Sequence, residues 1–108
     1  MLIVPLQPVP NQAVTIALAN QLCQINVYQK GTALYLDLLV NNVAVITGTI
    51  CENLNRLVRS LYLGFSGDLA FIDNQGSEDP VYTGLGPTAD ARFTLAYIEA
   101  SELLPNEG

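Results

Sequence analysis

The chain has 108 residues, of which 50% are hydrophobic and only 13% are charged, about half the charged share of an ordinary soluble domain. Ten acidic and four basic residues give a net charge of -6. This charge excludes proteins that bind nucleic acid by electrostatic attraction to its phosphates, and it predicts no contact with nucleic acid. The length fits one domain, 1–108, and so apolar a small domain is predicted to bury surface against other chains, as an oligomer or an assembly subunit.

Residues 1–11 are predicted to form an extended arm. The prolines at positions 5, 8 and 10 exclude a helix there, because proline lacks the amide donor and biases its predecessor toward extended geometry. We expect an edge strand or a strap across a neighbouring chain, and we expect removal of residues 2–10 to spare the fold and weaken assembly. The candidate partner contacts in the arm are Leu2, Ile3 and Val4.

The next two segments, 12–19 and 22–29, alternate apolar and polar residues with the period of a strand and are predicted to pair as a hairpin. The turn is expected at Asn20-Gln21. In the second strand Cys23 shares a face with other apolar residues while the opposite face is polar, so the hairpin has a dry side and a wet side.

Residues 33–51 are predicted to form the central hairpin. Adjacent Asn41 and Asn42 tolerate the positive φ angles that a two-residue turn requires, and Leu36 and Ile46 are expected to face inward. The period of two and the β-branched residues suit a sheet better than a membrane helix, so no membrane span is predicted. The N-terminus has neither a basic lead nor a long apolar run, which argues against a signal peptide and predicts maturation in a cytoplasm.

Residues 52–59 allow a helical turn or a loop with a short strand, and we favour the irregular form because consecutive elements usually stay adjacent. The glycines at 64 and 67 predict a bend or bulge before a strand over 69–72. Arg56 and Arg59 are expected to anchor an acidic neighbour or the rim of an interface. The aromatic candidate contacts here are Tyr62 and Phe65.

Residues 74–91 are predicted to form a long loop between the last strands, since this stretch is rich in glycine, proline and acidic residues. Val81-Tyr82 is a candidate brief strand within it, and Tyr82 is a candidate partner contact. A final strand over 92–100 and one helical turn over 101–104 complete the chain. Short strands without a long helix predict an all-β fold, a small antiparallel β-barrel or sandwich built from hairpins.

The sequence predicts no catalytic, cofactor-binding or metal-ligating residue, no cofactor and no enzymatic activity. Histidine is absent, which removes the commonest general base and metal ligand. Cys23 and Cys51 are interpreted as core thiols, and a disulfide between them is left open. The oxygen-rich run 73–79 lacks the spacing of the helix-loop-helix calcium motif. An alternative function is a small-ligand or carbohydrate-binding β module, with a pocket formed by Tyr62, Phe65 and Tyr82 near Asp68 and Asp73.

Several stretches carry, in their order and spacing, a likeness to a known family: residues 3–6, 9–12, 43–48, 62–73, 79–86 and 92–97. Together they resemble the baseplate plug proteins of contractile-tailed bacteriophages, of the cyanophage hub type. The resemblance implies a structural virion protein that packs in the central hub of the tail baseplate and helps to plug or assemble the channel. It implies contacts with hub, spike and tail-tube proteins, a trimer or sixfold ring, and assembly in the host cytoplasm.

Overall fold

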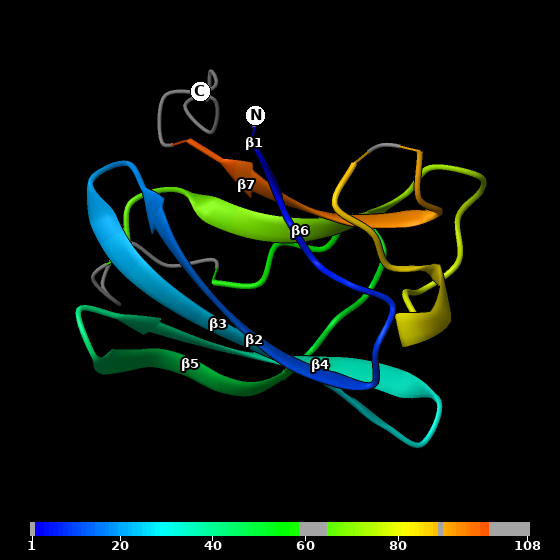
Figure 1. Cartoon of the computed structure of the whole chain (residues 1–108), viewed down its shortest axis with the longest axis horizontal. Coiled ribbons are helices and arrows are strands. Elements are labelled where there is room, and N and C mark those ends of the chain that lie inside the picture. The colour runs from blue at the N-terminus through cyan, green and yellow to red at the C-terminus, as the bar shows by residue number, and fades with distance from the viewer. Residues whose placement is uncertain (1, 59–64, 89, 100–108) are drawn as a thin grey trace.

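The computed structural model describes residues 2–58, 65–88 and 90–99, which form two antiparallel sheets stacked as a sandwich, with no closed barrel among the described strands (Figure 1). The all-β prediction is therefore confirmed in its sandwich form. The larger sheet has the order β2-β3-β4-β5, with β2 at Asn11–Leu18, β3 at Gln21–Lys30, β4 at Ala33–Val40 and β5 at Val43–Ile50. The smaller sheet has the order β1-β7-β6, with β1 at Leu2–Val4, β7 at Phe93–Ile98 and β6 at Asp68–Asp73.

Two-residue turns connect the strands at one end of the larger sheet. Asn41 and Asn42 have φ angles of 51° and 67°, which confirms the predicted central turn. The first hairpin turns at Ala19-Asn20, with φ angles of 51° and 64°, one residue earlier than predicted. The reason is that Leu18, the last residue of β2, pairs with Gln21, the first residue of β3. The Gln21 side-chain amide also donates to the Leu18 carbonyl oxygen at 3.0 Å.

The core lies between the two sheets and is lined by the alternate residues of β3 and β4. Leu36 and Leu38 are fully buried, and Ile46, which pairs with Leu38, is partly buried against the same core. The predicted dry face of these strands is thereby confirmed. The fully buried aliphatic side chains of the two sheets include Ile25, Leu34, Leu36, Leu38, Leu69 and Leu95.

A bulge separates the two halves of the pairing between β4 and β5, where the register shifts between Leu36 and Leu39. Gly48 has a φ of +60°, and its amide donates to the Asp37 Oδ1 atom at 2.7 Å. The Tyr28 hydroxyl donates to the same oxygen at 3.2 Å. Asp37 therefore satisfies the backbone where β5 departs from regular pairing.

The N-terminal segment is extended, as predicted, but it packs on its own chain. β1 pairs with β7, and both Val4 and Leu6 are fully buried. Removing residues 2–10 would delete these two core side chains and an edge strand of the smaller sheet. The expectation that this removal spares the fold is therefore wrong, because pairing across the whole chain makes the segment part of the core.

The predictions for the segments before and after β6 have different outcomes. Described residues 52–58 are irregular, as predicted, and run beside β6. The predicted brief strand at Val81-Tyr82 is wrong, because Tyr82–Gly84 form a 3₁₀ helix, η2, in which Leu85 donates to the Tyr82 carbonyl oxygen at 3.1 Å. The predicted helical turn over 101–104 lies outside the described residues.

We predict that Leu36→Ala lowers the free energy of unfolding by about 2–5 kcal/mol, because it leaves a cavity at a fully buried position. Leu22→Ala in the neighbouring strand is the matched control, since Leu22 is 52% exposed and its truncation should change stability by less than about 0.5 kcal/mol. Urea unfolding followed by circular dichroism measures both. Equal losses in the two variants would contradict the assignment of faces.

Candidate functional site

The N-terminal candidate contacts have unequal exposure. Leu2 is 47% exposed and Ile3 is half-buried, so both remain available to a partner. Val4 is fully buried and pairs with Leu95 in the same core. Val4 is therefore not part of the candidate contact surface.

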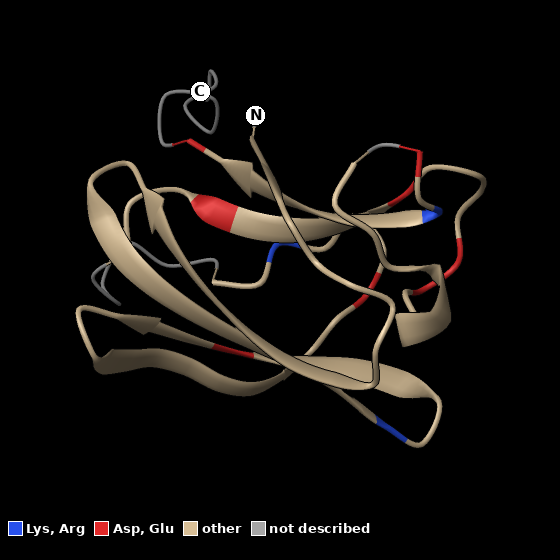
Figure 2. Cartoon of the chain, viewed as in Figure 1, with Lys and Arg blue, Asp and Glu red and all other residues tan. Residues whose placement is uncertain are grey.

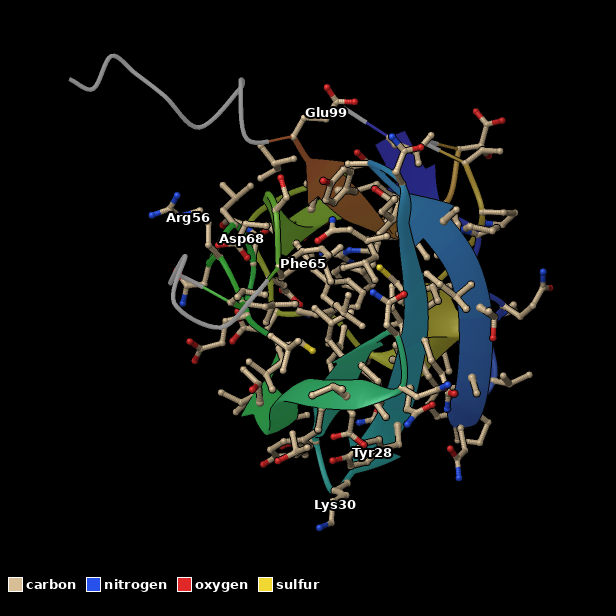
Figure 3. The ribbon with its side chains drawn as sticks, turned by 90° about the vertical axis from the view of Figure 1, so that its left-hand side faces the viewer. Tyr28, Lys30, Arg56, Phe65, Asp68 and Glu99 are labelled. Carbon is tan, nitrogen blue, oxygen red and sulfur yellow. The ribbon has the colours of Figure 1, made fainter. Side chains whose placement is uncertain are left out.

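Phe65 is also a core residue. It is 2% exposed, and its ring packs edge-on against Tyr97 with ring centroids 5.7 Å apart (Figure 3). The predicted bend next to it is present at Gly67, which has a φ of +94°, and a Cβ atom at this glycine would lie 2.5 Å from the Ile98 carbonyl oxygen. Phe65, which the sequence indicated as a candidate contact, therefore packs inside the sandwich. It is not part of the contact surface.

Arg56 has the acidic neighbour that the sequence predicted. Its side chain is 49% exposed, and its Nε atom lies 3.9 Å from Asp68 Oδ2 (Figure 3). Asp68 is buried at the start of β6, where its Oδ1 accepts backbone N–H groups from Leu57 at 3.1 Å and Val58 at 2.8 Å. This carboxylate fixes the irregular segment against the sheet. Arg59, the second predicted anchor, lies outside the described residues.

Asp73, at the other end of β6, is held by Arg92. The Arg92 Nε and Nη2 atoms donate to the two carboxylate oxygens at 3.1 and 3.0 Å, and the Asp73 side chain is fully buried. Hydrogen bonds from Arg92, together with those from the Glu78 and Gln75 amides, hold the pKa of Asp73 well below its usual range. The ion pair ties the start of the long loop to the start of β7.

The pocket of the alternative ligand-binding hypothesis is not formed by the described residues. Asp68 and Asp73 stand at opposite ends of a six-residue strand, about 16 Å apart at about 3.3 Å per residue. Tyr82 belongs to η2, at the opposite end of the molecule from the start of β6 (Figure 1). Phe65 is inside the core, and Tyr62 lies outside the described residues.

Both cysteines of the chain lie in the core. Cys23 and Cys51 are free and buried, which confirms their interpretation as core thiols, and burial raises the pKa of Cys51 to about 12. No group of three or more histidine, cysteine, aspartate or glutamate residues within 2–58, 65–88 and 90–99 is placed to hold a metal ion. In the same ranges, no helix is long and apolar enough to cross a membrane.

Charge is distributed unevenly over the two sheets. The strands of the larger sheet carry one acidic residue, Asp37, and one basic residue, Lys30, while most other described charges lie near β6, on the loops and at the end of β7 (Figure 2). The outer face of the larger sheet is therefore nearly uncharged. Such a face suits contact with another protein surface better than contact with a charged polymer.

The family model described as "Cyanophage baseplate Pam3 plug gp18" matches residues 1–100. The chain belongs to this family of baseplate plugs. Membership confirms the resemblance found in the sequence and gives the chain a structural role in a phage tail baseplate, among other baseplate proteins. No curated protein matches the chain.

Leu54 is an exposed residue that no sequence pattern indicated. Leu54 is 66% exposed and has a φ of +63°, a conformation that is unfavourable for a bulky side chain. Its amide donates to the Phe71 carbonyl oxygen at 2.8 Å, which holds the segment beside β6. Nothing in the local sequence signals this backbone angle, because it arises from the approach of two segments distant in the chain.

We predict that the Asp73–Arg92 pair makes stability depend on pH in the acid range. Since the folded-state pKa of Asp73 is depressed, the stabilisation is complete above its ordinary value of about 3.9 and is lost as pH falls toward the folded value. Asp73→Asn should be less stable than the wild type at neutral pH, with the difference shrinking as pH falls below about 4. Urea midpoints over this range measure it.

The control for that experiment is Asp90→Asn, a change at an exposed acid of the same loop. It should leave the pH dependence of the urea midpoint unchanged. An Asp73→Asn variant that keeps the full wild-type pH dependence would refute the role of the ion pair.

Proposed function

We propose that this protein packs in the central hub of the tail baseplate, near the spike and the end of the tail tube, and helps to seal or assemble the channel there. The observation that carries the proposal is the match of the plug family over residues 1–100. A two-sheet sandwich suits a part that fills space between larger components. The virion is its final location, and the host cytoplasm is where it joins the baseplate.

The proposed role is structural and involves no catalysis. The two buried carboxylates of β6 are engaged in holding the fold, Asp68 by accepting backbone amides and Asp73 by pairing with Arg92. Both cysteines are buried, and burial raises their pKa values, which disfavours the reactive thiolate. These observations support a protein whose function lies in its surface.

The surface that meets baseplate neighbours is proposed to include the segment beside β6. Leu54 and Arg56 are both exposed there, and a bulky apolar residue held in an unfavourable backbone conformation is a feature that points to function. Leu2 and Ile3 on β1 and Tyr82 on η2 are further proposed contacts, at other places on the molecule. Contacts on several sides suit a part enclosed by more than one neighbour.

The acidic charge also suits a component of a channel through which the genome must pass. With a net charge of -6, the protein repels phosphate backbones. Association through apolar and polar protein contacts would then close the channel without holding the nucleic acid. The net charge supports this part of the proposal.

We predict that Leu54→Asn folds at least as well as the wild type and is incorporated less into tails. Asparagine tolerates a positive φ, so the change removes the apolar side chain without adding backbone strain. Quantitative mass spectrometry of purified virions, made by complementing a phage that lacks the gene, measures incorporation. Thr32→Asn, in the exposed turn between β3 and β4, is the control and should be incorporated normally.

The two possible failures of this experiment have different meanings. Absence of the wild-type chain from purified baseplates would refute the proposed function. Normal incorporation of Leu54→Asn beside wild-type levels of the control would refute only the contact at Leu54.

A further inference from the structure

The edge of the larger sheet formed by β2 lacks the features that normally protect an exposed strand. β2 has eight residues, carries no charge and no proline, and pairs with β3 without a bulge. An uncharged, regular edge of this length offers a row of backbone donors and acceptors to another strand. β2 is therefore suited to pair with a strand from outside the chain.

The other described edges are protected. β5 is interrupted by the bulge opposite Asp37. The free side of β6 is covered by residues 53–57, whose amides at Leu54 and Leu57 donate to the Phe71 and Leu69 carbonyl oxygens at 2.8 and 2.9 Å. β1 has only three residues and is followed by a proline. Among the described strands, the open edge is thus at β2.

The register fixes which backbone groups β2 presents. The Gln29 amide donates to the Pro10 carbonyl oxygen at 2.9 Å, and antiparallel pairs alternate between bonded and non-bonded, so every even-numbered residue of β2 is bonded to β3. The N–H and C=O groups that point to the open edge belong to the odd-numbered residues, Asn11, Ala13, Thr15 and Ala17. All four are exposed.

The open edge also leaves apolar side chains incompletely covered. Val14 and Ile16 face the core but are only partly buried, although their neighbours in β3 on the same face are fully buried. β1 and β2 belong to different sheets, and Figure 1 shows the chain running from one to the other between them. A strand added along β2 would cover these two side chains.

The sequence of β2 is nearly symmetric about Thr15, because Ala-Val precedes this residue and Ile-Ala follows it. We propose that the free protein forms a twofold dimer in which β2 pairs antiparallel with β2 of a second copy, centred on Thr15. Ala13 then bonds to Ala17 of the other copy, and the two Thr15 residues bond to each other. On the inner face Val14 lies opposite Ile16, a pairing of two β-branched side chains.

Self-complementarity is what selects a second copy as the occupant. A twofold contact places the same patch on both subunits, and a strand that reads alike in both directions about its centre meets that requirement. Because β2 carries no charged residue, the acidic side chains that give each copy its net charge of -6 lie outside the strand that forms the contact. A twofold pair differs from the trimer or sixfold ring that the family resemblance implies, so we assign the dimer to the chain before it enters the baseplate.

The first test is a crosslink in the full-length protein. Residues that form a bonded antiparallel pair have Cα atoms about 5.5 Å apart, within the range of a disulfide. Thr15→Cys should therefore give a covalent dimer under mild oxidation, seen on a non-reducing gel. Thr47→Cys, at an exposed position of β5, is the control and should run as a single chain on the same gel, while the buried native cysteines do not compete.

The second test measures the wild-type interface without a new thiol. Sedimentation should give a species of twice the 11.6 kDa chain mass, and the Ala13, Thr15 and Ala17 amides should exchange slowly with deuterium. Thr15→Lys should give a folded monomer, because it brings two charges together at the twofold axis. Gln24→Lys places the same charge on the cross-strand partner of Thr15 and should keep the dimer.

The proposal is overturned if the Thr15→Cys and Thr47→Cys variants crosslink equally. It is also overturned if the wild type sediments as a monomer whose three edge amides exchange rapidly. A monomer in which these amides become protected only when purified baseplate proteins are added would assign the edge to a baseplate strand and refute the second copy as its occupant.

Discussion

The fold depends on the packing of alternate apolar residues of β3 and β4 against the smaller sheet. Leu36 and Leu38 are fully buried from one side and Leu95 from the other, so each sheet supplies the surface that the other requires. The smaller sheet joins the first strand of the chain to the last described one. The sandwich is therefore complete only when β1 and β7, near the two ends of the described chain, have paired. No short continuous segment contains all the strands that the smaller sheet requires.

The carboxylates at the two ends of β6 show how this protein uses its few charges. Asp68 accepts backbone amides of the preceding irregular segment, and Asp73 binds Arg92 across the long loop. Both groups satisfy connections that have no regular pairing, since a buried backbone donor without a partner is costly. The two acids that the sequence placed near the alternative pocket thus hold the connections in place.

This use of charge leaves the outer surface to protein contacts. The larger sheet is nearly uncharged on its outside, β2 presents an open edge, and Leu54 stands exposed beside β6. A structural part of a baseplate requires such surfaces, because its function is to be held by its neighbours. Membership of the plug family and the distribution of charge and apolar surface agree on this point.

The sequence by itself determined the strands of the larger sheet, the central turn and the inward faces of β3 and β4. These features are local, since an alternation of period two and a pair of asparagines act within a few residues. Only the tertiary structure decided that Val4 and Phe65 belong to the core, that the alternative pocket is not formed, and that Leu54 is exposed in an unfavourable conformation. The physical reason is that each of these outcomes depends on pairing between segments distant in the chain, β1 with β7 and residues 53–57 with β6, which no local pattern specifies.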